Sequence, residues 1–219
     1  LLADDARFVV PARDALRSRP NALAMSFVAS EPIEALAKAK PEIRDAAVSA
    51  LIELCLHELF TFRVMQTDPN FANYRWNPET EQIVLLDFGA THEISVEVSL
   101  AYRDLLRAGL ADDRAAVLAA LTKIGFIKPD LDARHHAAIL DMAEMGFGVL
   151  RGPDPFDFHD NDFADRLRAR GMAIGGKREL WHLPPAETLF LQRKIVGLYL
   201  LATRLGARVD VAGLVRRFT

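Results

Sequence analysis

The segment QTDPNFANYRWNPETEQIVLLDFGATHE, residues 66–93, carries the strongest signal in this 219-residue chain. It contains Asp68, then Asn73, and finally Asp87 in an Asp-Phe-Gly triplet that follows an apolar run. Pro69 disfavours a helical conformation for Asp68, so the segment should begin as an extended or turned loop. We expect Asp68 and Asn73 to point into one cleft, and the chain to return so that Asp87 arrives beside them.

The return path is predicted to be a β-hairpin. Tyr74-Arg75-Trp76 and the apolar run from Ile83 to Leu86 have the composition of two strands, and residues 77–81, Asn-Pro-Glu-Thr-Glu, are rich in turn formers. Such a hairpin would bring the end of its second strand back to the loop before its first strand.

Helical patterns surround the hairpin. From Pro41 to about Val64 a polar stripe (Glu42, Asp45, Ser49, Glu53, His57) opposes an apolar one (Ala47, Leu51, Leu54, Cys55, Leu59, Phe62). Beyond Ser95 we expect helices over residues 95–110, 113–124, 131–150, 161–173 and 185–206. Residues 151–160 are expected to form an irregular loop, and residues 22–28 a short strand that ends at a break. The sequence therefore predicts a mainly α fold with a small β-hairpin.

Composition narrows the function. With 51% hydrophobic and 26% charged residues the chain should fold, and its net charge of -3 gives no basic footprint, so nucleic acid is not an expected partner. The single Cys55 excludes an internal disulfide and is expected to fill the core. The longest nearly apolar stretch, Ile195 to Ala202, is far shorter than the roughly 20 residues that span a bilayer.

The residue types in segment 66–93 suit phosphoryl transfer. Mg²⁺ prefers oxygen ligands, commonly one or two carboxylates together with water and phosphate, and Asn73 and Asp87 can supply such oxygens. Asp68 is then left to orient or deprotonate an acceptor hydroxyl or water. Asp and Asn also cap backbone groups in turns, so each piece alone has a plain structural explanation. The three together, in this order, after a long helix and around a hairpin, are typical of kinases.

These residues resemble the UbiB family, the AarF-domain or ADCK atypical kinase-like proteins. MQTDPNFAN (65–73) is similar to the family's catalytic loop, IVLLDFGATHE (83–93) to its metal-binding segment, and LPPAETLFLQRKIVGLYLLATRLGA (183–207) to its closing helix. Residues 22–36 resemble its last N-lobe strand and hinge. The resemblance implies a protein-kinase-like fold, with residues 1–29 as the truncated end of the N-lobe and hinge strand and residues 30–219 as the helical C-lobe.

The resemblance also implies residue roles. Asp68 takes the position of the catalytic aspartate, and Asn73 and Asp87 take those of the magnesium ligands. Met25 stands at the gatekeeper position, and Ser26 and Val28 would offer backbone groups to the adenine of ATP. Asn70, which stands where protein kinases carry lysine, is assigned with them to the nucleotide site.

Several positions depart from ordinary protein kinases. Gln66 and Thr67 replace the His-Arg that precedes the catalytic aspartate, and Asn70 replaces a cation that would stabilise the transferred phosphoryl group. His92 stands where the family is expected to have Arg, and Ser26 where its hinge has Glu. The chain lacks an Ala-Pro-Glu motif after Gly89, and a helix is expected to start soon after that glycine. Transfer to protein substrates is therefore expected to be slow or absent.

Other parts of the expected ATP site have no counterpart in this chain. The phosphate-covering loop, the Lys-x-Gly-Gln motif and the Lys and Glu pair are missing, and the only lysines before Asp68, Lys38 and Lys40, follow the hinge. The first apolar segments also lack an evident partner strand. We therefore expect this chain to be an incomplete ATP site and a piece of a longer enzyme.

Three functions remain open. The first is a UbiB-type, Mg²⁺- and ATP-dependent atypical kinase or ATPase that supports ubiquinone biosynthesis or other isoprenoid-lipid metabolism. The resemblance then implies a peripheral location at a membrane, on its cytoplasmic or organelle-matrix side, and partner proteins of a lipid-biosynthesis complex. The second is a small-molecule phosphotransferase of the aminoglycoside or choline kinase type. The third is a nucleotide-gated pseudokinase that serves as a scaffold.

Two further features bear on a lipid partner. Arg166, Arg168 and Arg170, near Lys177 and Arg178, could contact anionic headgroups, although a solvated face is the simpler interpretation. The apolar stripe of residues 189–205 could line a lipid tail, although a core helix is the simpler explanation. His135-His136 is not expected to bind metal because adjacent helical residues face different directions.

Overall fold

The computed structural model describes residues 1–128, 133–152, 154–159, 162–166, 168–169 and 185–219. Its helical elements are η1 (Ile33–Lys38), α1 (Pro41–His57), η2 (Glu58–Phe62), η3 (Phe71–Asn73), α2 (Val96–Leu110), α3 (Arg114–Ile124), α4 (Ala133–Arg151), α6 (Ala186–Leu205) and α7 (Val211–Arg216). Its strands are β1 (Phe8–Val9), β2 (Glu31–Pro32), β3 (Val64–Gln66), β4 (Tyr74–Asn77), β5 (Gln82–Leu85), β6 (Thr91–Glu93), β7 (Phe156–Asp157) and β8 (Arg208–Val209).

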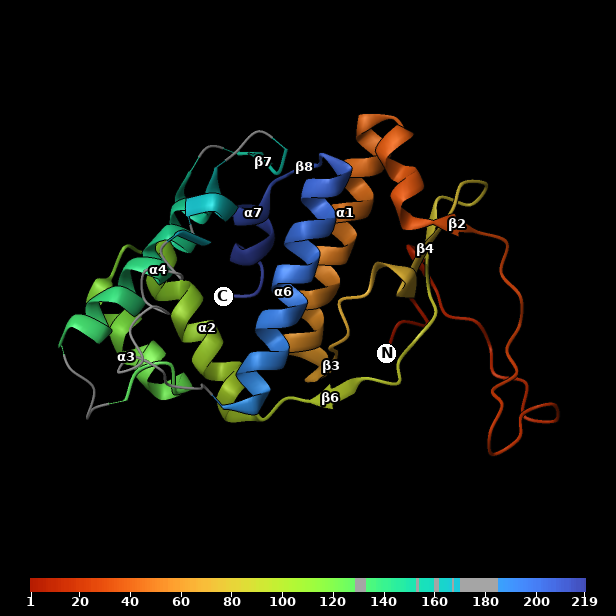
Figure 1. The fold of residues 1–219 in the computed structure, drawn as a ribbon, viewed down its shortest axis with the longest axis horizontal. Coiled ribbons are helices and arrows are strands. Elements are labelled where there is room, and N and C mark those ends of the chain that lie inside the picture. The colour runs from red at the N-terminus through yellow and green to blue at the C-terminus, as the bar shows by residue number, and fades with distance from the viewer. Residues whose placement is uncertain (129–132, 153, 160–161, 167, 170–184) are drawn as a thin grey trace.

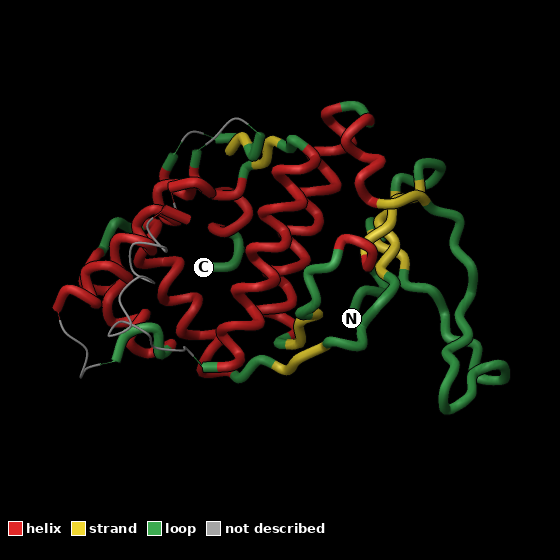
Figure 2. The backbone as a smooth tube through the Cα atoms, in the orientation of Figure 1, coloured by secondary structure: helices red, strands yellow, loops and turns green. Residues whose placement is uncertain are grey.

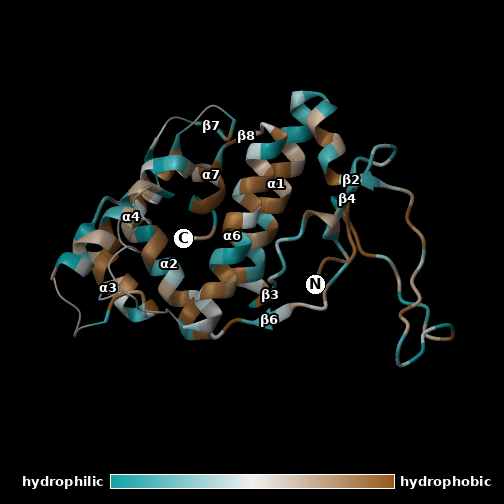
Figure 3. Cartoon of the chain, in the orientation of Figure 1, coloured by the Kyte–Doolittle hydropathy of each residue, from teal (hydrophilic) through white to brown (hydrophobic). Residues whose placement is uncertain are grey.

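The body of the molecule is built from packed helices. Helix α1 packs against α6 and α7, and α2 packs against α3 and α4; Figure 1 shows α1 and α6 side by side. Side chains at Ser95, Asp113 and Asp210 accept hydrogen bonds from the first turns of α2, α3 and α7, which satisfies amides that a helix start leaves unpaired. Figure 3 shows apolar and polar residues on different faces of these helices, as burial of one face requires.

The predicted hairpin is confirmed and belongs to a small sheet. Strands β4 and β5 pair antiparallel, with Tyr74 opposite Leu85, and the four-stranded order is β1-β5-β4-β2. Figure 2 shows this sheet at one end of the helical body. The expectation that the first apolar segments lack a partner strand is wrong, because Phe8 and Val9 pair in parallel with β5. Such a short strand has too little pattern to reveal its partner.

Residues 22–28 do not form the predicted strand. The segment makes isolated bridges, Arg13 with Met25 and Arg19 with Ala22, and no continuous ladder. Figure 1 shows the chain around it as an extended arm that leads away from the helical body. Leu23 is 65% exposed and Phe27 is 92% exposed, so the apolar run is not packed on the core of the described residues. The predicted boundary between an N-lobe remnant (residues 1–29) and the C-lobe (residues 30–219) stays a prediction.

The long helix predicted from Pro41 is confirmed, with a change of geometry near its end. Helix α1 stops at His57, and Glu58–Phe62 continue as one π-helical turn. The predicted apolar stripe is buried or packed on the core, and Cys55 is buried. Burial raises the pKa of the Cys55 thiol to about 12, so it remains a neutral core residue.

The helices after Ser95 follow the predicted ranges closely at α2, α3, α4 and α6. Sequence patterns missed the short α7 and the η1 turn. The expected irregular loop of residues 151–160 contains a strand, β7, which pairs with β8. The predicted helix over residues 161–173 lies partly outside the described residues. The described residues also exclude Arg170, Lys177, Arg178 and the side chain of His135. Among the described residues, no helix is both long enough and apolar enough to cross a membrane.

Candidate functional site

A tight loop brings Asp68 and Asn73 together. Pro69 keeps the chain extended after Asp68, and the side chain of Asn70 then accepts a hydrogen bond from Ala72 N–H, at 3.0 Å, which starts the η3 turn. At the end of that turn Asn73 Nδ2 donates to Asp68 Oδ2 at 2.8 Å. The expectation that both side chains point to one place is confirmed.

The hairpin returns Asp87 to the same place. Leu86 N–H donates to Asn73 O at 3.0 Å, and Asn73 and Asp87 line one small cavity. Asp87 Oδ1 accepts the N–H of Gly89 at 2.7 Å. A Cβ at residue 89 would lie 3.1 Å from that oxygen, so a side chain there would require the Asp87 carboxylate to shift by a few tenths of an ångström.

The oxygens of this arrangement suit a hard cation. The hydrogen bond between Asn73 and Asp68 uses the amide nitrogen, so the carboxamide oxygen of Asn73 remains for a ligand. Asp87 is exposed and uses only one carboxylate oxygen in its bond to Gly89. Mg²⁺ needs few protein ligands because water and phosphate complete its shell. The donor set therefore fits Mg²⁺, with Asn73 and Asp87 as the residues that would hold it.

A second small sheet joins the loop that carries Asp68 to the segment that carries Asp87. Strand β3, just before the loop, pairs antiparallel with β6, just after the Asp-Phe-Gly triplet, and sets Gln66 opposite Thr91. The next residue, Thr67, donates both its N–H (2.9 Å) and its hydroxyl (2.7 Å) to Ala90 O. Helix α2 begins at Val96, so the short connection expected after Gly89 is confirmed.

Behind the loop lies a buried polar cluster of Glu58, Gln66, Tyr74 and Lys194, which the sequence analysis did not identify. Lys194 is 2% exposed, and its Nζ lies 3.2 Å from Glu58 Oε2, 3.0 Å from Tyr74 OH and 3.4 Å from Gln66 Oε1. Glu58 Oε1 also accepts the backbone N–H of Gln66 at 3.2 Å. The ammonium thus donates hydrogen bonds to Tyr74 and Gln66 and forms an ion pair with Glu58 Oε2, a buried oxygen that accepts no hydrogen bond from the described residues.

The electrostatics of this cluster depend on the pairing. Burial lowers the pKa of Lys194, but attraction to Glu58, together with that to Tyr74 and Cys55, outweighs it and leaves the pKa raised, so the lysine stays protonated. Burial raises the pKa of Glu58, and the charge of Lys194 opposes that shift. A buried charge without its partner is costly, so each group depends on the other.

Two sequence signals could have revealed the cluster. Glu58 falls in phase with Leu51 and Leu54 on the apolar stripe of its helix, and not on the polar stripe. Lys194 is likewise in phase with Leu191 and Leu198. A charged residue at a buried helical position implies a charged or polar partner, although the pattern cannot say which one.

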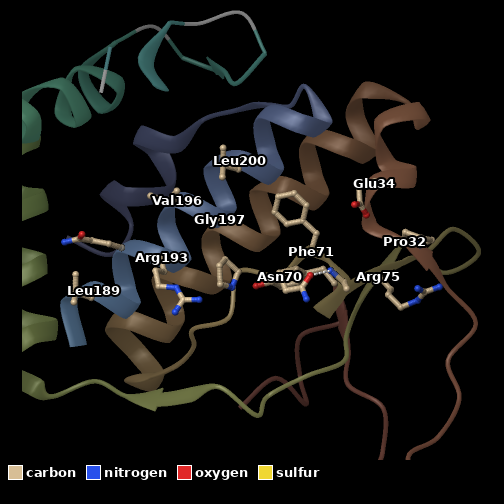
Figure 4. Close-up of a pocket in the computed structure, with 14 residues that line it drawn as sticks. Pro32, Glu34, Asn70, Phe71, Arg75, Leu189, Arg193, Val196, Gly197 and Leu200 are labelled. Atoms are coloured by element: carbon tan, nitrogen blue, oxygen red, sulfur yellow. Dashed lines mark hydrogen bonds between the residues drawn. The ribbon is translucent and has the colours of Figure 1, made fainter. Parts of the chain in front are cut away.

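A groove of about 980 Å³ opens beside the loop. Its lining is mostly apolar and includes Phe71 from the loop and Val196 and Leu200 from α6, as Figure 4 shows. The side chains of Val196 and Leu200 are about half exposed there. Arg193 and Arg75 also line the groove, so it combines apolar walls with two cations.

Helix α6 also touches the loop directly. A Cβ at Gly197 would lie 2.2 Å from the Cβ of Pro69, closer than atoms can approach. Glycine at this position therefore lets the helix backbone pack against the residue that follows Asp68.

The residues expected to bind adenine lie apart from this loop, in the extended arm. Ser26 N–H donates to Ala12 O at 2.8 Å, Ser26 Oγ accepts Ala12 N–H at 2.9 Å, and Val28 O accepts Ser30 Oγ–H at 3.1 Å. Met25 is 42% exposed. Their assignment to adenine stays a prediction, as does that of Asn70.

The fold and the loop define the class of protein. A catalytic-type loop, a hairpin and an Asp-Phe-Gly segment on a helical lobe are those of a kinase-like fold, and a Mycobacterium tuberculosis protein solved in complex with erythromycin has the same fold. The match has a TM-score of 0.73 at 17% identity and covers 99% of this chain and 53% of that chain.

The chain belongs to the ABC1 atypical kinase-like family, whose domain model matches residues 1–121. It is similar to the mitochondrial atypical kinase COQ8 of Saccharomyces cerevisiae, with 34% identity over 98% of this chain and 43% of that protein. It is also similar to the mitochondrial atypical kinase COQ8B of Rattus norvegicus, with 32% identity over 95% of this chain and 39% of that protein. The chain thus spans less than half the length of these relatives, and the expected resemblance to the UbiB family is confirmed.

Proposed function

We propose that the full-length protein containing this chain binds Mg²⁺-ATP and hydrolyses it, or transfers its phosphoryl group, at the Asp68 loop. The observation that carries the proposal is the hydrogen bond from Asn73 to Asp68, with Asp87 held beside Asn73 through the hairpin. These are a base and two oxygen ligands in the order that phosphoryl transfer uses.

Each residue then has a distinct role. The carboxylate of Asp68, oriented by Asn73, accepts the proton of the attacking water or hydroxyl, so that ADP and phosphate or a phosphorylated acceptor are formed. Asn73 and Asp87 hold Mg²⁺, which when bound neutralises charge on the phosphates. Met25, Ser26, Val28 and Asn70 belong to the nucleotide site in this proposal.

The substrate side of the proposal is isoprenoid-quinone or other lipid metabolism at a membrane surface. Two facts support it: the relatives named above are mitochondrial atypical kinases, and the groove beside the loop is mostly apolar. The family match does not favour an aminoglycoside or choline kinase activity.

The test uses the full-length protein with two substitutions. Asp87→Asn should abolish Mg²⁺-dependent binding of a fluorescent nucleotide, because the carboxylate that would hold the metal becomes a neutral carboxamide. Asp68→Asn should leave that binding within about twofold and lower ADP production by roughly 10²- to 10⁴-fold, the usual value of a general base. The control is Asp104→Asn, the same change on the exposed face of α2. Unchanged Mg²⁺-nucleotide affinity in Asp87→Asn would refute the proposal.

A nucleotide-gated pseudokinase is the second candidate, and Asn70 favours it. The Asn70 side chain caps the η3 turn and supplies no positive charge to a phosphoryl group. Mg²⁺-nucleotide binding without steady ADP production in the wild-type protein would select this candidate.

A further inference from the structure

Lys194 contacts both ends of the loop that holds the site. Its Nζ lies 3.4 Å from the side chain of Gln66, two residues before Asp68, and 3.0 Å from the hydroxyl of Tyr74, the residue after Asn73. No residue of segment 67–73 itself is contacted by these bonds. The ammonium group therefore holds the two points at which the loop enters and leaves the core.

The carboxylate of Glu58 completes this arrangement. It pairs with Lys194 at 3.2 Å and accepts the backbone N–H of Gln66 at 3.2 Å, so it binds the entry point of the loop through the main chain. Glu58 opens the π-helical turn η2, a local widening of a helix that recurs at functional sites. Helix α6 adds a third support, because Gly197 packs against Pro69 in the middle of the loop.

The cluster is too well enclosed to act on a substrate directly. Lys194 is 2% exposed and Glu58 is 6% exposed, so neither is a binding residue for nucleotide in solution. Both hydrogen bonds of the lysine go to residues that flank the loop. The separation of Asp68 and Asn73, which one hydrogen bond of 2.8 Å maintains, then depends on where Gln66 and Tyr74 are held.

We propose that Lys194 is a positioning residue, which sets the geometry of the Mg²⁺ and phosphoryl-transfer loop through its hydrogen bonds to Gln66 and Tyr74. The effect of Lys194 on metal binding and catalysis rests on the proposed function. Its support of the loop rests on the contacts alone. It predicts that loss of the lysine donors impairs metal binding even when the buried charge has been balanced.

The test separates positioning from charge balance in the full-length protein. Lys194→Met leaves Glu58 buried without its partner and should lower the melting temperature. The double variant Lys194→Met with Glu58→Gln removes both charges. The carboxamide oxygen introduced by Glu58→Gln can still accept a hydrogen bond from Gln66 N–H. Because neutral replacement of a buried pair is often well tolerated, the double variant should regain most of the melting temperature.

The decisive readout is the Mg²⁺ concentration that gives half-maximal nucleotide binding. In the double variant it should stay raised by about 10-fold or more, as when other groups that orient metal ligands are lost. Nucleotide affinity measured without metal should remain within about twofold, because the Mg²⁺ ligands take no part in that measurement. Tyr74→Phe, which removes one acceptor and keeps the ring, should raise the Mg²⁺ requirement by a smaller factor. Lys123→Met, the same substitution at an exposed lysine, is the control.

A second readout does not depend on nucleotide. Hydrogen exchange of the backbone amides in residues 64–74 should be faster in the double variant, while that of α2 and α3 stays as in wild type. If the double variant recovers the wild-type melting temperature, Mg²⁺ requirement and exchange rates together, Lys194 only balances a charge and the proposal is overturned. If the wild-type protein shows no Mg²⁺-dependent nucleotide binding, the proposed function fails, and the exchange rates still decide whether Lys194 braces the loop.

Discussion

Two lysine-carboxylate pairs in this molecule have the same length and opposite surroundings. Lys194 and Glu58 join α6 to η2 at 3.2 Å, with side chains 2% and 9% exposed. Lys123 and Asp104 join α3 to α2, also at 3.2 Å, with side chains 54% and 52% exposed. Distance alone would rank them as equals, so any difference between them must come from burial.

Burial changes what each pair can do. Water screens the exposed pair and can replace either partner, so its net contribution is small. The buried pair has no such substitute, and its donors are shared with groups next to the Asp68 loop. One pair is therefore a surface contact between neighbouring helices, and the other connects the helical core to the site.

Removal of the buried lysine should have the largest effect. Lys194→Met leaves Glu58 without its partner charge, and we expect the full-length protein to lose about 3–5 kcal/mol of unfolding free energy. Chemical denaturation followed by intrinsic fluorescence measures it. A loss below about 1 kcal/mol would show that burial does not distinguish the two pairs.

The cost of Lys194→Met should also depend on pH. The folded-state pKa of Glu58 is already raised by burial, and loss of the Lys194 charge, which opposes that shift, raises it further. The folded state then binds this proton more tightly than the unfolded state. Stability is therefore fully present below the ordinary glutamate pKa and falls as the pH rises toward the folded pKa.

In that window the slope should approach about 1.4 kcal/mol per pH unit. The measurement compares Lys194→Met with the double variant that also carries Glu58→Gln, from pH 4 to pH 8. The double variant lacks the titrating carboxyl, so the difference between the two should widen with pH. Parallel curves would mean that Glu58 does not carry the penalty.

Disruption of the contact between α6 and the loop should cause the next largest loss of stability. Gly197→Ala places a methyl group where the Cβ of Pro69 now packs, and overpacking of this kind costs about 1–3 kcal/mol. Denaturation gives the cost, and Gly148→Ala in α4, where a Cβ would meet nothing within 4 Å, is the matched control. Equal stability of the two variants would show that the loop can shift freely.

The exposed pair should show the smallest effect. Lys123→Met breaks its contact with Asp104 and should change the unfolding free energy by about 1 kcal/mol or less. High salt should reduce even that difference, since both side chains are more than half exposed. A cost as large as that of Lys194→Met would contradict the role assigned to burial.

Local sequence predicted the elements that depend on local chemistry. The Pro after Asp68, the turn-rich residues 77–81 and the apolar run before Asp87 were enough to predict an extended loop and a hairpin that meet at one site, and the structure confirms both. The long helix from Pro41 was readable because its two stripes repeat over several turns.

Other features could not be predicted from local sequence because they depend on partners that are distant in the chain. Strand β1 has two residues and exists only because β5 offers an edge, and β6 is held by β3 across the site. Residues 22–28 were predicted as a strand from composition, yet they form only isolated bridges, since strand propensity needs a sheet to pair with.

By itself, then, the sequence determined the family, the mainly helical kinase-like fold, and the identity of Asp68, Asn73 and Asp87 as the candidate site. The mainly helical fold and the candidate site follow from residue order and from periodicity, which act over a few turns of chain, whereas the family and its kinase-like fold follow from the resemblance of the quoted segments. Only the tertiary structure decided that Lys194 and Glu58, well over a hundred residues apart, meet beneath that loop. Whether a buried charge is tolerated depends on which partner the fold delivers to it, and local pattern carries no record of that partner.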